Sequence, residues 1–175
     1  MPSSASGEYA MCRSRWLVSL AMTVGAVLLA GCARTPPGPE AQTAAAEKSL
    51  RTFLGLLAEA KYGEASGLYG GPVEVMQVWF PDQDPQDVAG LLSRACDSRL
   101  LLCLPVRSIQ PAKAAVSGEI AYDVEFNLPD GTLFVRGPCC GATSTEMPYE
   151  STFTFRARPE ADGGFVVLDL PPYVP

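Results

Sequence analysis

Residues 119–128, EIAYDVEFNL, alternate between apolar and polar side chains, and no other feature constrains the fold as strongly. The apolar face consists of Ile120, Tyr122, Val124, Phe126 and Leu128. The opposite face consists of Glu119, Ala121, Asp123, Glu125 and Asn127. A repeat of two residues is typical of a β-strand that is buried on one face and solvated on the other. We therefore expect a sheet with one wet, acidic surface.

Other segments around this strand also have strand character. They are LPVRSI (104–109), LFVRG (133–137), YESTFTFRARP (149–159) and GFVVLDL (164–170). Pro129-Asp130-Gly131 is expected to turn the chain from 119–128 into 133–137, because proline presets the first corner and glycine accepts a positive φ. The tail PPYVP (171–175) is expected to be extended, since proline has no N–H for a ladder. This predicts four or five antiparallel strands in sequence.

The segment before the predicted strands has apolar residues at helical spacing. Five apolar side chains fall on one face of a segment that begins at residue 46: Leu50, Phe53, Leu54, Leu57 and Ala58. We expect this helix to weaken near 61–63 and to restart briefly over 64–69. Residues 73–80, VEVMQVWF, are compatible with a helix or a strand. Helices followed by consecutive strands predict an α+β domain, with N-terminal helices packed on a four- to five-stranded antiparallel sheet.

Three aspartates, Asp82, Asp84 and Asp87, lie close together before a predicted helix. A calcium loop of the EF-hand kind needs glycine at its sixth position and glutamate at its twelfth. Counted from Asp82, those positions hold Asp87 and Ser93. Capping explains the cluster better: Asp84 as the N-cap, Pro85 in the first turn and Asp87 at the positive end of the helix dipole.

The N-terminal part of the chain has the pattern of an export signal. Arg13 and Arg15 precede sixteen mostly apolar residues, WLVSLAMTVGAVLLAG, which end at Cys32. This pattern is typical of a secretory signal, and the run is shorter than the ~20 apolar residues of a membrane-spanning helix. An uncleaved anchor with an incidental cysteine is the alternative. Under either interpretation the rest of the chain is expected to be exported and attached to a membrane.

The four residues Leu29-Ala30-Gly31-Cys32 resemble the lipobox of bacterial lipoproteins. The resemblance implies that the Cys32 thiol receives a diacylglyceryl group and that the signal is cleaved just before it. Two or more acyl chains hold a protein stably on a bilayer. We therefore expect a lipid-anchored protein on the extracytoplasmic side of a cell membrane.

The expected domains follow from this processing. Residues 1–31 are the signal peptide, 32–45 the lipidated cysteine with a flexible spacer, and 46–175 a single α+β domain. The spacer prediction rests on residues 33–45, which contain three prolines, one glycine and no large apolar side chain. Because Glu8, Arg13 and Arg15 leave with the signal, the remaining 144 residues carry 11 basic and 18 acidic side chains, a net charge of −7. An acidic chain without a basic run argues against nucleic acid as a partner.

The chain contains no histidine. Its absence removes the usual general base at neutral pH, the usual nitrogen ligand of zinc and every Ser-His or Cys-His nucleophile pair. We therefore predict no catalytic residues, no metal site and no cofactor. Asp123, Glu125 and Tyr122 remain as candidates for a general base, but the two carboxylates fall on the solvated face, where their acidity stays ordinary.

Four cysteines remain after export: Cys96, Cys103, Cys139 and Cys140. In an oxidising compartment disulfides persist, and this spacing does not suit a tetrahedral zinc site. If 104–109 and 133–137 both flank 119–128, Cys103 and Cys139 lie at opposite ends of the sheet, roughly 20 Å apart. A disulfide spans only about 4.4–6.8 Å between α-carbons. We therefore predict a Cys96–Cys103 disulfide.

Cys139 and Cys140 are adjacent, between Gly137-Pro138 and Gly141. Three states stay open for them: a vicinal disulfide in an eight-membered ring, two free thiols, or bonds to another molecule. A structural or ligand-contact role is favoured over redox catalysis, because the CxxC spacing and a nearby cation are both missing.

The phrases YGEASGLYGG, LFVRGPCCGA and PYVP, with the element order over residues 46–175, resemble an uncharacterised family of bacterial lipoproteins with a nuclear-transport-factor-2-like, or cystatin-like, domain. The resemblance implies helices wrapped around a curved sheet to form a cone. The mouth of such a cone is catalytic, binds a small molecule or is filled by side chains. No active residues carry over from this family.

The function predicted from the sequence is non-catalytic binding of an envelope protein or a small apolar ligand by a membrane-anchored domain. Trp79, Phe80 and the loop CCGATSTEMP (139–148) are the expected contact surface if the two aromatic residues are exposed; burial in the core is the favoured alternative for them. A cone-type enzyme with a buried carboxylate and an envelope thiol-redox protein are the alternative functions.

Overall fold

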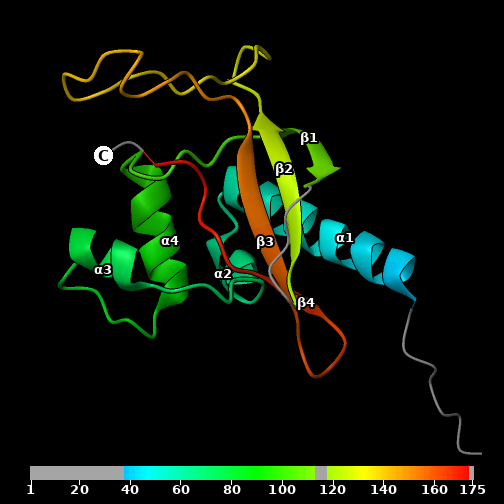
Figure 1. The fold of residues 1–175 in the computed structure, drawn as a ribbon. Coiled ribbons are helices and arrows are strands. Elements are labelled where there is room, and N and C mark those ends of the chain that lie inside the picture. Colours follow the sequence, from blue (N-terminus) through cyan, green and yellow to red (C-terminus); the bar gives the residue numbers. More distant parts are fainter. Residues whose placement is uncertain (1–37, 113–117, 174–175) are drawn as a thin grey trace, which may run out of the picture. The chain divides into compact units, whose positions relative to one another are not determined.

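The computed structural model describes residues 38–112 and 118–173, all within one compact unit, Pro36–Pro175. The helices are α1 (Pro39–Ala58), α2 (Tyr62–Ser66), α3 (Glu74–Trp79) and α4 (Val88–Asp97). The strands are β1 (Val106–Pro111), β2 (Ile120–Phe126), β3 (Phe153–Pro159) and β4 (Phe165–Val167). Helices come first and strands follow, which confirms the α+β prediction (Figure 1).

The four strands form one antiparallel sheet in the order β1-β2-β3-β4. The long alternating segment becomes β2, a central strand paired with β1 and β3. Its side chains Tyr122, Val124 and Phe126 are fully buried, whereas Asp123 and Glu125 are half-exposed on the other face. The predicted division of this strand into a core face and a wet acidic face is thus present.

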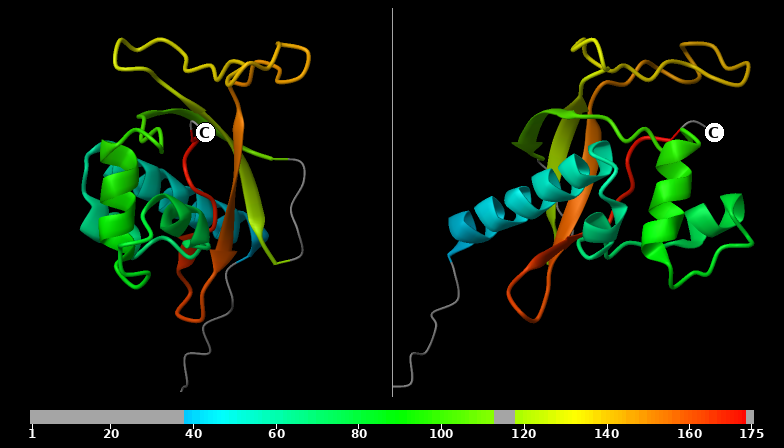
Figure 2. Two further views of the ribbon diagram at one scale, coloured as in Figure 1. Left: turned by 90° about the vertical axis from the view of Figure 1, so that its left-hand side faces the viewer. Right: turned by 180° about the vertical axis from the view of Figure 1, so that it is seen from behind.

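Helix α1 crosses one face of the sheet and contacts all four strands (Figure 2). Its apolar stripe is the one that helical spacing predicted, and Leu50, Phe53, Leu54 and Leu57 are at most 2% exposed. The stripe packs against the buried face of β2 and β3 in a single hydrophobic core. Apolar burial of this kind is the main favourable term in folding.

Helix α1 begins earlier than predicted. Residues 39–45, assigned above to the flexible spacer, are helical and form its first two turns. Pro39 is pre-organised for the first turn of a helix, and the alanine-rich run that follows has high helix propensity. Tertiary contacts hold this end in place: Ala46 is fully buried, and the carbonyl of Thr43 accepts a hydrogen bond from the Tyr122 hydroxyl (2.5 Å).

The ambiguous segment 73–80 forms the helix α3, which packs on α4. The predicted N-cap of α4 was wrong: Asp87, not Asp84, caps this helix, accepting a hydrogen bond from the Gly90 N–H (2.9 Å). Asp84 instead closes a tight turn, where its side chain accepts from the Gln86 N–H (2.8 Å). Pro85 therefore lies in that turn, before the helix. The local turn competed successfully with an earlier helix start.

Residues 133–137 were predicted to be a strand alongside β2, but only the start of this hairpin forms: the Phe134 N–H donates to the Phe126 carbonyl (2.9 Å). Beyond that bond the segment makes isolated bridges, Asn127–Leu133 and Arg136–Glu150. The partner of β2 on that side is β3, in register from Ile120–Ala157 to Val124–Phe153. Residues 127–150 instead extend past the end of the sheet where β2 ends and β3 begins (Figures 1 and 2). Phe153, Phe155 and Ala157 of β3 are buried, whereas no residue of 133–137 is, so pairing β2 with β3 gives the larger packing gain.

Candidate binding cavity

The C-terminal segment leaves the sheet directly after β4, and a cavity opens where it departs. The Leu168 N–H still donates to the Arg156 carbonyl (2.9 Å). At the next position the Asp169 side chain, instead of the backbone, accepts from the Arg156 N–H (2.7 Å). Pro171 and Pro172 follow, and neither has an N–H with which to pair. The segment therefore crosses to the residues that follow α4, where the Pro172 carbonyl accepts from the Leu102 N–H (2.8 Å).

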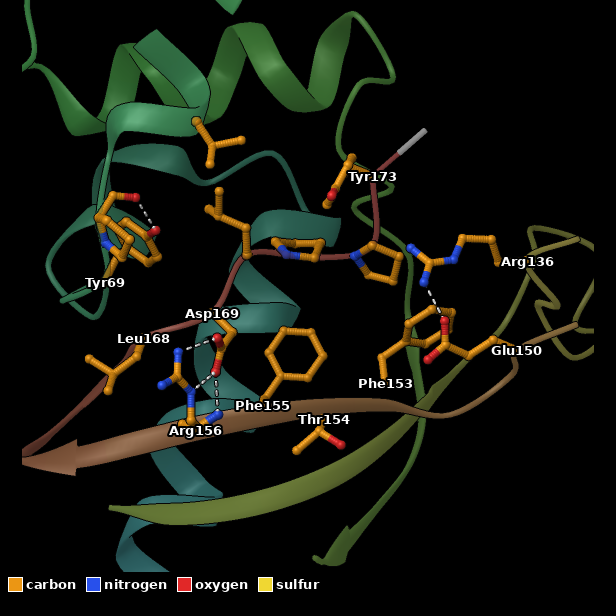
Figure 3. Close-up of a pocket in the computed structure, with 15 residues that line it drawn as sticks. Tyr69, Arg136, Glu150, Phe153, Thr154, Phe155, Arg156, Leu168, Asp169 and Tyr173 are labelled. Atoms are coloured by element: carbon orange, nitrogen blue, oxygen red, sulfur yellow. Dashed lines mark hydrogen bonds and ion pairs between the residues drawn. The ribbon is translucent and has the colours of Figure 1, made fainter. Parts of the chain in front are cut away.

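The cavity between this segment and β3 has a volume of about 370 Å³ (Figure 3). Apolar side chains dominate its lining: Val75, Phe153, Phe155, Leu168, Leu170, Pro171 and Pro172. Phe155 is 1% exposed and joins the cavity to the core, whereas Val75 and Tyr173 are 44% and 46% exposed. A concave, mostly apolar surface with a few polar groups is the usual form of a small-ligand site.

An unpaired stretch of strand edge lies in the cavity, at Thr154. On β3 the backbone groups of Arg156 and Arg158 point toward β4, so those of Thr154, two residues earlier, point the same way. Its ladder partner on that side would be a continuation of β4, which has already turned away. In the residues that the structure describes, no group bonds to the N–H or C=O of Thr154. Thr154 is one of the residues that line the cavity.

An ion pair closes each end of the cavity, as Figure 3 shows. At one end Arg156 donates to Asp169 through Nη2 (2.8 Å) and Nε (3.0 Å). The Asp169 carboxylate, and more weakly Glu119, raises the pKa of the Arg156 guanidinium above its ordinary value. Two parallel hydrogen bonds hold such a pair in one geometry. At this end of the cavity the charges of Arg156 and Asp169 therefore already neutralise each other.

At the other end Arg136 pairs with Glu150 through side chains and backbone together. The two backbones exchange hydrogen bonds of 2.7 and 2.9 Å, and the side chains form an ion pair. The Arg136 guanidinium also lies 5.3 Å from the centre of the Phe153 ring, within cation–π range. Since each arginine faces a carboxylate, the cavity carries no net charge.

Tyr69, which lies between α2 and α3 in the chain, forms part of the cavity wall. Its hydroxyl donates to the Pro72 carbonyl (2.7 Å), and its ring stacks on Phe53 at 5.9 Å. Burial, with the nearby carboxylates of Asp169 and Glu74, raises the pKa of the Tyr69 phenol above its ordinary value. Because the phenol stays protonated, it acts here as a hydrogen-bond donor and as apolar surface, and not as a base.

The predicted contact surface is not one patch. Phe80 is 8% exposed and lies in the core under the Arg94 guanidinium, 4.4 Å from its ring centre. Trp79 is half-buried against Tyr173, with the ring centres 6.0 Å apart. Trp79 therefore supports a residue of the cavity mouth, while Phe80 is structural.

Cys96 and Cys103 form the predicted disulfide, with their α-carbons 5.6 Å apart. It ties the last turn of α4 to the segment before β1. The geometric premise behind the prediction was nevertheless wrong, because residues 133–137 do not run back along β2. Local proximity, across a sequence separation of seven residues, accounts for the pair.

Cys139 and Cys140 occupy a tight turn in the segment that extends past the sheet. The Ala142 N–H donates to the Cys139 carbonyl (2.9 Å), and Cys140 and Gly141 both have positive φ, 59° and 91°. The two sulfurs lie 2.8 Å apart in a hydrogen-bonded contact between free thiols. This contact, and then burial, raises the pKa of the Cys139 thiol. The two sulfurs carry no covalent bond to each other here, and the choice among the three states left open by the sequence stays a prediction.

The candidate general bases do not meet in the cavity. Asp123 accepts from the Thr154 hydroxyl (2.8 Å) and Glu125 from the Ser108 hydroxyl (2.9 Å), both on the outer face of the sheet. Tyr122 is buried against α1. Among the residues described, no charged side chain is buried.

The aspartates near α4 each have a partner: Asp82 pairs with Arg94 at 3.0 Å, which lowers the pKa of that carboxyl group. In residues 38–112 and 118–173 no three histidine, cysteine, aspartate or glutamate side chains converge as a metal site. No helix in these ranges is long and apolar enough to span a bilayer. The predicted lipidation site, Cys32, lies outside the described residues, as does the signal segment.

A comparison with protein-family models finds no match to this chain, and a comparison with curated proteins finds no similar sequence. The arrangement of residues is therefore the main guide to function. The cavity was not predicted from the sequence. The available signal was the order Asp169-Leu170-Pro171-Pro172 directly after a short strand. In that order a side-chain carboxylate takes the place of a backbone acceptor, and two prolines remove backbone donors.

Proposed function

We propose that this protein is a membrane-anchored extracytoplasmic lipoprotein whose domain binds a protein segment or a small apolar ligand without catalysis. The observation that carries the proposal is the cavity of about 370 Å³ beside β3. Its lining is mostly apolar, its two arginines are paired with carboxylates, and none of the charged residues that line it is buried. Such a lining favours uncharged, apolar occupants.

The proposal includes a cystatin-like cone for the domain. In its support, α1 lies across one face of a four-stranded antiparallel sheet, and α2 to α4 continue the helical layer. Residues 133–137 would represent a reduced fifth strand, since they make two isolated bridges next to β2 and β3. A cavity beside the sheet is the feature that this cone would use for binding.

Anchoring through Cys32 is a part of the proposal that rests on the sequence alone. The lipobox-like residues Leu29-Ala30-Gly31 support it, as does the basic and apolar segment before them. We expect Cys32→Ala to prevent acylation and cleavage, so that the precursor accumulates. Metabolic labelling with palmitate and fractionation of the envelope measure both effects. Labelling of the variant to the same level as the parent would refute the anchor.

A dye titration tests the cavity. We expect N-phenyl-1-naphthylamine, a neutral apolar probe, to bind the full-length protein in detergent with saturation at one site, after subtraction of empty micelles. Val75→Trp should abolish this binding, because Val75 lines the cavity and a larger side chain fills it. Val78→Trp is the matched control: Val78 lies on the same helix and is 79% exposed, away from the cavity. Saturable binding that both variants retain would contradict the proposed role of the cavity.

An envelope thiol-redox protein is the second candidate, favoured by the adjacent sulfurs of Cys139 and exposed Cys140. It requires these two thiols to be free and reactive in the purified protein. Quantitative alkylation under denaturing, non-reducing conditions measures this. One free pair supports the candidate, whereas no free pair at these positions removes it.

A further inference from the structure

We infer that the cavity binds an extended peptide segment of another protein, which adds as a short strand to the free edge of β3 at Thr154. The inference rests on the proposed binding role of the cavity and names its occupant. Peptide binding by strand addition uses main-chain hydrogen bonds for affinity and pockets for alternate side chains for specificity. Both elements are present here, as the following observations show.

The first observation is an interruption in the pairing along one edge of β3. At one side of the interruption, Arg156 is paired with Leu168 and Asp169. At the other side, Glu150 exchanges two backbone hydrogen bonds with Arg136. Between these paired positions the N–H and C=O of Thr154 point toward the same edge of β3 and have no partner among the described residues. The edge is therefore open at Thr154, a residue that lines the cavity.

The second observation concerns what a ligand must supply there. One donor and one acceptor on the same strand edge are complementary to the C=O and N–H of an opposing residue in an extended peptide. An acyl chain or an aromatic ring would cover these two groups without bonding to them, and unsatisfied buried polar groups are unfavourable. The chemistry of the edge thus favours a peptide over a purely apolar ligand.

The third observation concerns the side chains of the peptide. The arginines at the two ends already face Asp169 and Glu150, so a charged side chain in the peptide would find no free counter-ion. Phe153, Phe155 and Leu170 offer apolar contact on the wall. Exposed Val75 and Tyr173 extend this apolar surface at the opening. The fitting segment is therefore uncharged and rich in apolar or β-branched residues.

Selection from a random heptapeptide library displayed on phage, against the full-length protein in detergent, tests the inference. We expect enriched peptides to be uncharged, to displace N-phenyl-1-naphthylamine and to slow hydrogen exchange of the Thr154 amide by at least about tenfold at saturation. Thr154→Pro removes this donor without removing a backbone hydrogen bond to β2, and should weaken peptide binding about tenfold. It also removes the hydroxyl that donates to Asp123, and Thr154→Ala, which lacks the same hydroxyl, controls for that loss. Thr154→Ala keeps the donor and should bind within about twofold of the parent.

The outcomes separate this inference from the proposed function. If the dye binds and no selected peptide displaces it, or if displacing peptides leave exchange at Thr154 unchanged, the inference is overturned and the cavity remains a small-ligand site. If neither dye nor peptide binds, both fail. Should Thr154→Pro not fold, as judged by circular dichroism, exchange at Thr154 in the parent protein decides the matter alone.

Discussion

The layer in which α1 packs on the sheet and the connection 127–150 between β2 and β3 differ sharply. In the layer, Phe53, Tyr122 and Phe126 are fully buried. In the connection no residue is buried, and Val135 and Tyr149 are 45% and 69% exposed. The connection is held by local turns and by the pairing of Arg136 with Glu150. Stability is thus expected to reside in the layer, while the connection supplies one end of the cavity and the exposed thiols.

The cavity lies at the boundary between these two regions. Its Arg156–Asp169 end is attached to β3 where β4 still covers the strand. Its Arg136–Glu150 end belongs to the connection. Ligand sites placed partly on loops gain adaptability, and loops tolerate change because few buried contacts depend on them. The two ends should therefore respond differently to mutation.

The largest expected effect on stability comes from a substitution in the layer of α1 and the sheet. Phe53→Ala removes a fully buried ring at the centre of α1 and should lower the free energy of unfolding by about 3–5 kcal/mol. Tyr149→Ala, in the connection, should change it by less than about 0.5 kcal/mol, because this ring is mostly exposed. Urea unfolding followed by circular dichroism measures both. Equal losses in the two variants would mean that the connection is part of the cooperative core.

The two cysteine pairs provide the next comparison. Replacing Cys96 and Cys103 with serine should lower stability by about 2–3 kcal/mol, the loop-closure entropy of so short a loop. Replacing Cys139 and Cys140 with serine should cost less than about 0.5 kcal/mol, since this turn contributes no buried side chain. Thermal unfolding of the two double variants gives the difference. A larger loss from the second pair would overturn the comparison.

The ion pairs at the two ends of the cavity should differ less in how much they contribute to the free energy of unfolding. Asp169→Asn weakens charge-assisted hydrogen bonds to both the side chain and the backbone N–H of Arg156, and should cost about 1 kcal/mol. Arg136→Gln keeps the backbone bridge to Glu150 and should cost less than about 0.5 kcal/mol. The same urea measurement compares them. If Arg136→Gln is the more destabilising variant, the connection holds the cavity more firmly than its exposure suggests.

The smallest effect is on reactivity and not on stability. Since contact with Cys140 and burial raise the pKa of the Cys139 thiol, the neutral thiol is favoured and the nucleophilic thiolate appears only at higher pH. The rate of iodoacetamide alkylation at Cys139, followed by peptide mass spectrometry, should therefore rise at a higher pH than in an unfolded peptide of the same sequence. Cys140→Ser removes the first cause and should shift the profile down in pH. A profile that is unchanged by this variant would contradict the sulfur contact.

Periodicity predicted the parts of the fold whose burial depends on the local chain. The alternation in β2 and the helical spacing of Leu50 to Leu57 identified the core faces correctly, because a side chain's direction follows directly from strand or helix geometry. The residues at which helices begin were less predictable. Pro39 and the alanines after it looked like spacer, and only contact with Tyr122 and the core secures them as helix.

The sequence by itself determined the class of the domain, the core face of β2 and the pairing of Cys96 with Cys103, since these depend on near neighbours. Tertiary structure decided which strand borders β2, because β3 and residues 133–137 compete for one edge and packing across the sheet selects between them. It also decided the cavity. Thr154 is separated along the chain from Asp169 and Pro171, and only the fold brings the departing segment and the open strand edge to the same place.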